Sequence, residues 1–379
     1  MKRRLLVCCG ETSGDLYAAE LVRLLRLEPG EIEAFGLGGD RLAEQGVELL
    51  AHVRDLAVVG LLEVIGHLRR IHRVFRRVLA EVDRRRPDLA VLIDYPDFNL
   101  RLARELNRRG VPVAYYVSPQ LWAWRRGRLR AIRETVARMI VIFPFEEPLY
   151  REAGVPVSFV GHPLVDLARP VEDRAAFLRA RGLQPERPVV ALLPGSRPGE
   201  VRRHLPRIAD AVGRLARRRP DVQFILAVAP ALDAGPLIRA LDRPGVCAVV
   251  GETHSVLSAC TVALVASGTA TVEAALLGAP MVVFYRLSWL TFLLGRPLVR
   301  VPHYAMVNLI AGRKLVPELM QGDFSPDRAA REVLAILEDP ERRSGMLAGL
   351  DEVRRRLGAP GASQRAARIV RDMLEGCTP

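Results

Sequence analysis

The sequence has no long hydrophobic run. Hydrophobic residues make up 50% of the chain but occur in short stretches between charged segments. None of these stretches approaches the roughly 20 residues that a membrane-spanning helix requires. The basic start, MKRRLLVCCGETSGD, has an apolar run too short for a secretory signal peptide. We therefore expect a cytoplasmic protein without a spanning segment.

Signals for disulfides and metal sites are also missing. The five cysteines contain no CxxC pair, and the seven histidines form neither an HxxxH nor an HExxH pattern. An odd set of cysteines without such pairs is typical of buried free thiols. The histidine spacing disfavours a zinc site, so the sequence predicts no metal.

Aromatic residues are few, at 6%, whereas 56 Lys and Arg outnumber 43 Asp and Glu and give a net charge of +13. Such a charge favours an anionic partner: nucleic acid, a phosphorylated substrate or an anionic membrane. Nucleic-acid-binding proteins interleave basic patches with aromatic residues. The arginines here lie largely in segments with a helical pattern, so we expect no nucleic-acid partner.

Short apolar runs alternate with helical patterns, such as residues 16–27 and 102–110, along most of the chain. The runs are continuous rather than alternating, which is typical of parallel strands buried on both faces. Two successive sets predict an α/β protein with two doubly wound, Rossmann-like halves. The expected strands are residues 5–10, 32–39, 89–94, 111–119 and 139–145, then 188–195, 222–230, 246–251, 261–268 and 281–286.

A proline-punctuated join at residues 161–187 separates the two sets. We expect one domain at residues 1–165 and another at residues 166–354. Residues 325–376 have helical patterns only, and we expect the last helices, at about 355–379, to join the first domain.

Ligands of doubly wound sheets bind beyond the carboxyl ends of the strands, so the residues there are informative. In LPGSRPGEVRRH (193–204), Gly195 and Ser196 let the backbone approach a ligand, and a helix beginning near Pro198 offers free N–H groups. Arg197 adds a charged fork for phosphate. The alternative is an ordinary turn with a solvated arginine.

ASGTATVEAALLG (266–278) repeats this arrangement. Gly268 and Thr269 open a helix, which Thr269 could cap, and Glu273 one turn later can accept hydrogen bonds from ribose hydroxyls. The alternative is a capping box, but Thr269 and Glu273 are four residues apart rather than the three that a box requires.

Two further strand-end loops carry acids. GETSGD (10–15) contains Glu11, Ser13 and Asp15, which suit a sugar better than a diphosphate because acids repel phosphate. The alternative is helix capping by Ser13 and Asp15.

In DYPDFN (94–99), we expect Asp94 to end the strand and Asp97 to lie on a loop beyond Pro96. There the Asp97 carboxylate can serve as a general base towards a hydroxyl. The alternative is helix capping by Asp97 or Asn99.

Together these motifs resemble the lipid-A-disaccharide synthase family, glycosyltransferases of the GT-B architecture. The resemblance covers most of the chain, although Thr12 stands where the family usually has alanine. The matching segments are GETSGD, DYPDFN, YVSPQLWAWRRGR (116–128), GHP (161–163), LLPGSRPGEV (192–201), ASGTATVE (266–273) and NLIAGRKLVPELMQ (308–321).

The resemblance implies the reaction. A UDP-2,3-diacylglucosamine donor transfers its sugar to 2,3-diacylglucosamine 1-phosphate (lipid X), giving a β-1,6-linked disaccharide 1-phosphate and UDP. The anomeric centre inverts, so a single displacement with one base is expected. No metal or other cofactor is implied, and the sequence contains no DxD motif.

The resemblance also implies roles for residues. The first domain would hold the acceptor, with Asp97 as catalytic base and Glu11 and Ser13 on the acceptor-side loop. The second domain would hold the UDP-sugar. Its expected contacts are Gly195, Ser196, Arg197, Gly268, Thr269, Glu273 and Asn308, the last as a polar residue lining the donor site.

Lipid substrates predict a membrane surface. Residues 56–82 are apolar and then arginine-rich, and residues 287–304 combine Trp289 and Phe292 with Arg296 and Arg300. Such segments can lie in the interface of an anionic bilayer, which suggests peripheral association with the inner face of the inner membrane. The alternative is packing in the core or in a homodimer.

Two other classes of protein compete with this interpretation. The first is another GT-B enzyme acting on a UDP-amino sugar, either a 2-epimerase or the transferase that makes the lipid-linked peptidoglycan disaccharide. The second is a non-enzymatic scaffold, which would not require phosphate-type loops at corresponding ends of both halves.

Overall fold

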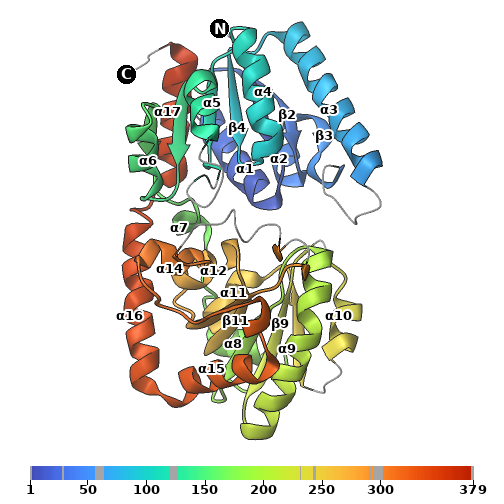
Figure 1. The fold of residues 1–379 in the computed structure, drawn as a ribbon, viewed down its shortest axis with the longest axis vertical. Helices are drawn as coiled ribbons and strands as arrows, with labels where there is room; N and C mark the ends of the chain where they lie inside the picture. The colour runs from blue at the N-terminus through green and yellow to red at the C-terminus, as the bar shows by residue number, and fades with distance from the viewer. Residues whose placement is uncertain are drawn as a thin grey trace. The chain divides into compact units, whose positions relative to one another are not determined.

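The computed structural model describes residues 2–27, 30–55, 64–119, 121, 127–230, 232–241, 245–289, 292–293 and 302–376. The chain divides into two compact units, which comprise residues 1–163 with 357–379 and residues 164–356. Each unit contains one β-sheet with helices packed around it (Figure 1).

The first unit has a seven-stranded sheet in the order β3-β2-β1-β4-β5-β6-β7. All its pairings are parallel, as predicted. The edge strands β3 and β7 were not anticipated, because they are short and only partly buried and therefore lack a continuous apolar run. The strands are β1 (Arg3–Cys9), β2 (Ile32–Gly38), β3 (Glu48–His52), β4 (Leu89–Ile93), β5 (Val113–Tyr116), β6 (Arg138–Val141) and β7 (Val157–Phe159).

The helices of this unit begin earlier than the sequence patterns suggested. α1 starts at Thr12 rather than at residue 16, and α4 starts at Pro96 rather than at residue 102. Proline suits the first turn of a helix because the N–H that it lacks has no intrahelical partner there. The helices are α1 (Thr12–Leu27), α2 (Asp40–Glu44), η1 (Val53–Asp55), α3 (Val64–Arg85), α4 (Pro96–Arg108), α5 (Arg128–Thr135), α6 (Glu146–Glu152) and α17 (Ala362–Glu375).

The C-terminal helix α17 belongs to the first unit. It packs against α1, and the guanidinium of Arg371 donates to the carbonyl of Leu25 at 2.5 Å. The chain therefore returns to its first unit after the second unit is complete (Figure 1).

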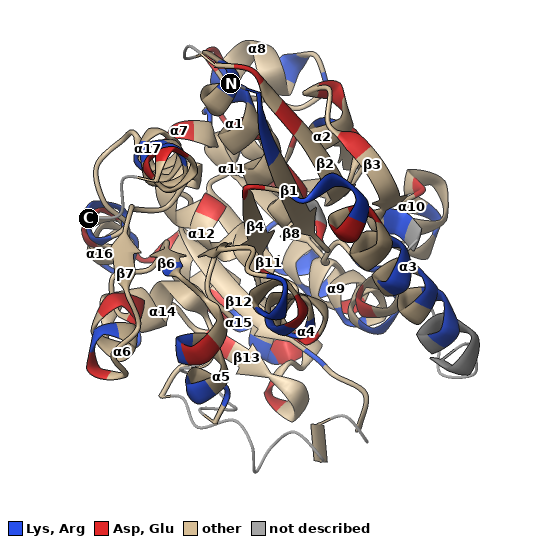
Figure 2. Ribbon diagram, turned by 90° about the horizontal axis from the view of Figure 1, so that it is seen from above, with Lys and Arg blue, Asp and Glu red and all other residues tan. Residues whose placement is uncertain are grey.

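The helix α3 is amphipathic in its described part. Val74, Val78 and Val82 join the hydrophobic core, whereas Arg73 and Arg76 are exposed. Figure 2 shows basic residues along much of this helix. The apolar side of this part of residues 56–82 therefore packs in the core, and its arginines lie on the outer face. Residues 56–63, the apolar start of that segment, lie outside the described residues.

The second unit has a six-stranded sheet in the order β10-β9-β8-β11-β12-β13, again with parallel pairings only. The three-residue strand β13 at the edge was not anticipated. The strands are β8 (Val189–Leu193), β9 (Gln223–Val228), β10 (Val246–Val250), β11 (Val262–Ala266), β12 (Met281–Tyr285) and β13 (Glu318–Met320).

Helices cover this second sheet, and the segment after residue 325 is helical as predicted. α9 begins at Pro198, the residue from which a helix was expected. The helices are α7 (Leu164–Leu167), α8 (Arg174–Arg179), α9 (Pro198–Arg218), α10 (Ala234–Leu241), α11 (Thr253–Ala259), α12 (Thr269–Leu276), α14 (Met306–Ala311), η2 (Gln321–Asp323), α15 (Pro326–Glu338) and α16 (Pro340–Arg356).

Both sheets have completely buried central strands. Every residue of β4, β8 and β11 is buried, which explains their continuous apolar sequences. Cys8 and Cys9 in β1 are buried free thiols, as expected. The prediction of two doubly wound α/β halves is therefore confirmed.

In each sheet the strand order reverses beside the first strand of the set. β1 lies between β2 and β4, and β8 lies between β9 and β11. The crevice beyond such a reversal is the usual ligand site of a doubly wound sheet. The four loops after β1, β4, β8 and β11 are those that the sequence analysis selected.

Candidate functional site

The loops after β1 and β4 lie side by side in the first unit. Cys9 pairs with Ile93 at the ends of these strands. The ring of Tyr95 then rests on Gly10, where an added Cβ would lie only 2.1 Å from Tyr95 Cγ. Burial raises the pKa of Tyr95 above its usual value, and the negative charges of Asp97 and Glu11 raise it further. Asp97 and Glu11 follow different strands, but both lie close enough to the Tyr95 phenol to raise its pKa.

Asp97 lies in the first turn of α4, so the expectation that it lies on a loop is wrong. Tyr95, in the left-handed conformation at φ 48° and ψ 56°, turns the chain before Pro96, so that the helix begins immediately. The side chain of Asp97 remains 68% exposed and forms an ion pair with Arg128. The carboxylate is thus accessible at the start of the helix, and a guanidinium lies against it.

Asp94 directly follows β4 and supports the loop through its backbone, consistent with the expectation that it ends the strand. Its carbonyl oxygen accepts from Tyr115 Oη at 2.6 Å and from Asn99 Nδ2 at 2.8 Å. Asn99 is completely buried and also donates to the carbonyl of Ile93 at 3.2 Å. Tyr95 is the N-cap residue of α4, and its side chain makes no capping bond, so the alternative of capping by Asp97 or Asn99 is wrong.

The acids of the β1 loop differ in their surroundings. Glu11 is exposed and Ser13 is half-buried within α1. Asp15 is buried, and its carboxylate accepts from the backbone N–H of Gly39 at 2.6 Å and of Arg41 at 3.2 Å. Asp15 therefore holds the start of α2 instead of capping α1.

The loops after β8 and β11 are also neighbours, because Leu193 pairs with Val265 at the ends of these strands. Gly195 has φ +118°, and an added Cβ would lie 3.0 Å from Glu200 Oε2. Glycine is therefore favoured here by the backbone conformation. Ser196 and Arg197 are exposed, and Arg197 Nη1 lies 3.2 Å from Glu200 Oε1.

The loop after β11 leads into α12, with Gly268 and Thr269 exposed at its start. Gly268 is the N-cap residue and Thr269 is already helical, so the expectation of a Thr269 side-chain cap is wrong. Glu273 is half-buried one turn later, and its Oε1 lies 3.4 Å from His254 Nε2. The start of α12 thus presents backbone N–H groups near a partly exposed carboxylate.

Asn308 does not line a surface, contrary to its expected place in a ligand site. It is completely buried, and its Oδ1 accepts from the N–H groups of Leu315 at 2.8 Å and Val316 at 2.9 Å. Its Nδ2 donates to the carbonyl of Val316 at 2.9 Å and to Glu318 Oε1 at 2.8 Å. These four bonds use the full capacity of the amide, so Asn308 organises the turn that leads to β13.

The sequence analysis did not assign three residues that support the loop after β8. Tyr285 Oη donates to Glu200 Oε1 at 2.8 Å, and His204 Nδ1 lies 2.8 Å from the carbonyl oxygen of Pro194. Glu200 and His204 fall within the segment that was selected as a phosphate loop. Their three- and seven-residue spacings from Arg197 place them on the first two turns of α9, a signal that could have identified them.

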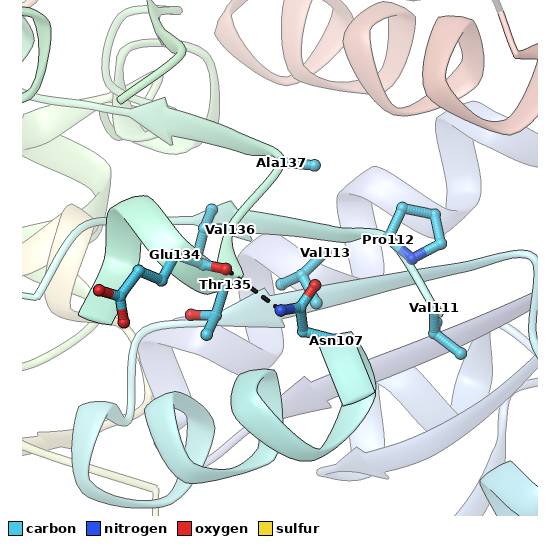
Figure 3. Close-up of a pocket in the computed structure, with 8 residues that line it drawn as sticks. All are labelled: Asn107, Val111, Pro112, Val113, Glu134, Thr135, Val136 and Ala137. Atoms are coloured by element: carbon cyan, nitrogen blue, oxygen red, sulfur yellow. Dashed lines mark hydrogen bonds between the residues drawn. The ribbon is translucent and has the colours of Figure 1, made fainter. Parts of the chain in front are cut away.

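A pocket of about 140 Å³ lies elsewhere in the first unit (Figure 3). It is lined by Val113 at the amino end of β5 and by Asn107 at the end of α4, whose amide donates to the carbonyl of Glu134 at 3.2 Å. This is the opposite end of the sheet from the acidic loops, so the pocket is not the predicted site. In the described part of the chain, no three His, Cys, Asp or Glu side chains cluster as metal ligands would.

Comparison with known proteins identifies the family. A sequence profile described as lipid-A-disaccharide synthetase matches residues 5–370. The lipid-A-disaccharide synthase of Syntrophus aciditrophicus is 50% identical over 366 residues, which cover 96% of this chain and 95% of that protein. The chain belongs to the lipid-A-disaccharide synthase family. It is therefore an enzyme of lipid A biosynthesis, and the scaffold interpretation is wrong.

Solved structures with lower identity establish the architecture of this family member. A UDP-GlcNAc 2-epimerase from Neisseria meningitidis superposes with a TM-score of 0.65 at 12% identity, covering 98% of this chain and all of that one. The calicheamicin glycosyltransferase CalG4 superposes with a TM-score of 0.62 at 17% identity over 100% of both chains. The GT-B fold is thus confirmed. The likeness to an epimerase is one of fold alone.

Proposed function

We propose that the enzyme transfers the sugar of UDP-2,3-diacylglucosamine to 2,3-diacylglucosamine 1-phosphate, with inversion at the anomeric carbon. The observation that carries this proposal is the exposed carboxylate of Asp97, which lies at the strand-order reversal of the first sheet. Glu11 and Ser13 lie at the end of the neighbouring strand and are the candidate acceptor contacts.

In the proposed step, Asp97 accepts the proton of the acceptor's 6-hydroxyl as that oxygen attacks C1 of the donor sugar. The bond between C1 and the diphosphate breaks at the same time, and UDP departs with the electron pair. One displacement inverts the configuration and needs one base. The guanidinium of Arg128 forms an ion pair with Asp97, so it orients the carboxylate and offsets its negative charge.

The second unit supplies groups suited to the departing diphosphate. The starts of α9 and α12 offer N–H groups with partial positive charge, and the exposed Arg197 adds a full charge. Such donors stabilise charge that develops on a leaving group. We therefore assign Gly195, Ser196, Arg197, Gly268 and Thr269 to the diphosphate, and we propose that no metal or other cofactor takes part.

Two assignments complete the donor site. Glu273, which is half-buried and contacts His254, is positioned to accept hydrogen bonds from ribose hydroxyls. Asn308 acts through the turn that it holds rather than through contact with the sugar.

We also propose that the enzyme acts in the cytoplasm at the inner face of the inner membrane. In the described part of the chain, none of the helices combines the length and the apolarity needed to cross a bilayer. Arg73, Arg76 and Arg77 on the outer face of α3 are exposed and suit anionic headgroups. Trp289, which is 74% exposed, and Leu293, which is 50% exposed, are candidates for acyl-chain contact.

The proposed reaction is tested by incubating the purified enzyme with UDP-2,3-diacylglucosamine, with and without lipid X. Release of UDP together with a disaccharide 1-phosphate is expected only when both substrates are present. Activity should be unchanged after treatment with a chelator. UDP release that does not need lipid X would instead indicate an epimerase- or hydrolase-like activity and contradict the proposal.

A further inference from the structure

The imidazole of His204 connects two strand-end segments of the second unit. His204 is completely buried in α9. Its Nδ1 lies 2.8 Å from the carbonyl oxygen of Pro194, which follows β8, and its Nε2 lies 3.1 Å from the backbone nitrogen of Arg286, which follows β12. One side chain therefore contacts the loop after β8 and the end of β12 at the same time.

These contacts determine which nitrogen carries the proton. A carbonyl oxygen only accepts, so Nδ1 must be the donor towards Pro194. Burial lowers the pKa of His204, which favours the neutral ring. Nε2 lies 3.1 Å from the backbone nitrogen of Arg286 and 3.3 Å from its carbonyl oxygen, and with the proton on Nδ1 it accepts from the nearer N–H. Both bonds are satisfied by a single neutral tautomer.

Aromatic side chains hold the ring in this orientation. The His204 ring packs edge-on against Phe284, with centroids 5.1 Å apart at 90°, and against Phe324, with centroids 6.2 Å apart at 82°. The imidazole has little freedom to turn, so its two hydrogen bonds are directional constraints on the backbone that they reach.

A second link runs beside the first. Glu200, one helical turn before His204, accepts from Tyr285 Oη at 2.8 Å and pairs with Arg197 at 3.2 Å. The loop from Pro194 to Arg197 is thus attached to the end of β12 at two points, through His204 at its first residue and through Glu200 at its last.

We propose that His204 is a positioning residue for the diphosphate-binding loop. By donating to the Pro194 carbonyl, it holds that oxygen towards the interior. A carbonyl oxygen turned towards Gly195–Arg197 would repel an anionic ligand, whereas the inward arrangement leaves the loop to N–H groups and Arg197. This inference rests on the proposed function, which assigns the loop to the diphosphate of the donor.

Two variants of His204 separate its hydrogen bond from its packing. Asparagine places an amide N–H near the position of Nδ1, and glutamine places an amide near the position of Nε2, while both lose the ring. We expect His204→Gln to bind UDP about tenfold more weakly than wild type in calorimetry, the scale of one hydrogen bond. The loss in His204→Asn should be about threefold smaller than that in His204→Gln. Arg202→Gln, an exposed change on the same helix, is the control.

A measurement on the unaltered protein covers the case in which either variant fails to fold. If the Pro194 contact favours UDP binding, then UDP must favour the contact by the same factor. Saturating UDP should therefore slow hydrogen exchange at His204 Nδ1 by about the fold-change expected for His204→Gln. Exchange that does not change on UDP binding would overturn the inference.

The outcomes also separate this inference from the function on which it rests. Equal loss of UDP affinity in His204→Gln and His204→Asn means that only packing matters, and it overturns the positioning role while leaving the donor site intact. Absence of UDP binding by the wild-type enzyme overturns the assignment of the loop itself, and with it both proposals.

Discussion

The two units use the same sheet topology at their sites but carry opposite charge there. In each, the first strand of the set is flanked by the second and the fourth, and the candidate residues follow the first and the fourth. At these strand ends the first unit carries Glu11, Asp94 and Asp97, whereas the second carries glycines, Ser196 and Arg197. The fold thus provides the place, and the side chains at the strand ends decide the chemistry.

The two units nevertheless share one arrangement of exposed and buried residues. The Asp97 carboxylate is 68% exposed at the start of α4, and the Arg197 side chain is 61% exposed before α9. Buried residues behind them, Asn99 in the first unit and His204 in the second, hydrogen-bond the backbone of the loops. In both units a buried side chain thus hydrogen-bonds the backbone beside an exposed candidate residue.

The largest expected effect separates the acids of the first unit. Asp97→Asn should reduce disaccharide formation by about 1,000-fold, because a positioned general base contributes roughly 100- to 10,000-fold. UDP affinity should stay near that of wild type, since the donor residues belong to the second unit. Asp94→Asn is the matched control, because Asp94 contributes through its backbone carbonyl. If Asp94→Asn were inactive and Asp97→Asn active, the catalytic base would be Asp94 at the strand end rather than Asp97.

The second-largest expected effect concerns Arg197 in the second unit. Arg197→Ala should lower kcat/KM for the donor by about 100-fold, as loss of one donor to a developing negative charge does. UDP affinity should fall as well, which is the reverse of the Asp97 phenotype. Arg202→Ala, which removes an exposed arginine from the same helix, tests whether charge alone matters. Similar losses in both variants would show a general electrostatic effect rather than a diphosphate contact.

A third, smaller effect compares arginines on the surfaces of the two units. Arg73→Glu with Arg76→Glu on α3 should weaken binding to vesicles containing anionic lipid by at least about 30-fold, since the loss of each arginine near such a surface costs roughly 1 kcal/mol and the new carboxylates add repulsion. Arg217→Glu with Arg218→Glu on α9 makes the same change in net charge on exposed residues of the second unit. Vesicle flotation that responds equally to both pairs would contradict a specific role for α3.

The last effect is on stability rather than on activity or binding, and it concerns His162, a buried histidine of the first unit. Burial lowers the pKa of His162 from its ordinary 6.5 to about 3, and its ring packs against Phe143 at 5.1 Å. The unfolded chain binds a proton there below about pH 6.5 and the folded one does not, so stability falls as the pH drops towards 3. Denaturation in urea across this range should show a slope of up to about 1.4 kcal/mol per pH unit. His162→Phe keeps a ring and should reduce the slope, and an unchanged slope would assign the acid sensitivity to other groups.

Much of the fold could be predicted because the central strands are buried on both faces. Continuous apolar sequences such as VVALL in β8 and VALVA in β11 are the direct result. The edge strands β3, β7 and β13 escaped prediction because they are short and half-exposed, so their sequences carry no comparable signal. The start of α4 was placed too late because proline was interpreted as a break at Pro96, where it opens the helix.

The candidate residues show the same limit. Arg197 and Gly268 lie at helix starts, as their local pattern predicted. Asn308 was expected to be a ligand contact, but whether a polar side chain faces a ligand or the interior depends on how the chain folds around it. Here the turn before β13 brings Glu318 and the N–H group of Leu315 onto the amide. The partners of His204 and Asp15 lie far along the chain.

The sequence by itself determined the family, the two doubly wound halves and the strand ends at which the candidate residues lie, because these depend on local patterns of apolar runs, glycines and charges. Only the tertiary structure decided which of the selected polar residues are exposed and which are buried and hydrogen-bond the backbone of the loops. It placed Asp97 on a helix, buried Asn308 and joined the loop after β8 to the end of β12 through His204. The physical reason is that burial and hydrogen bonding depend on which residues folding brings together, and a local sequence pattern does not show those residues.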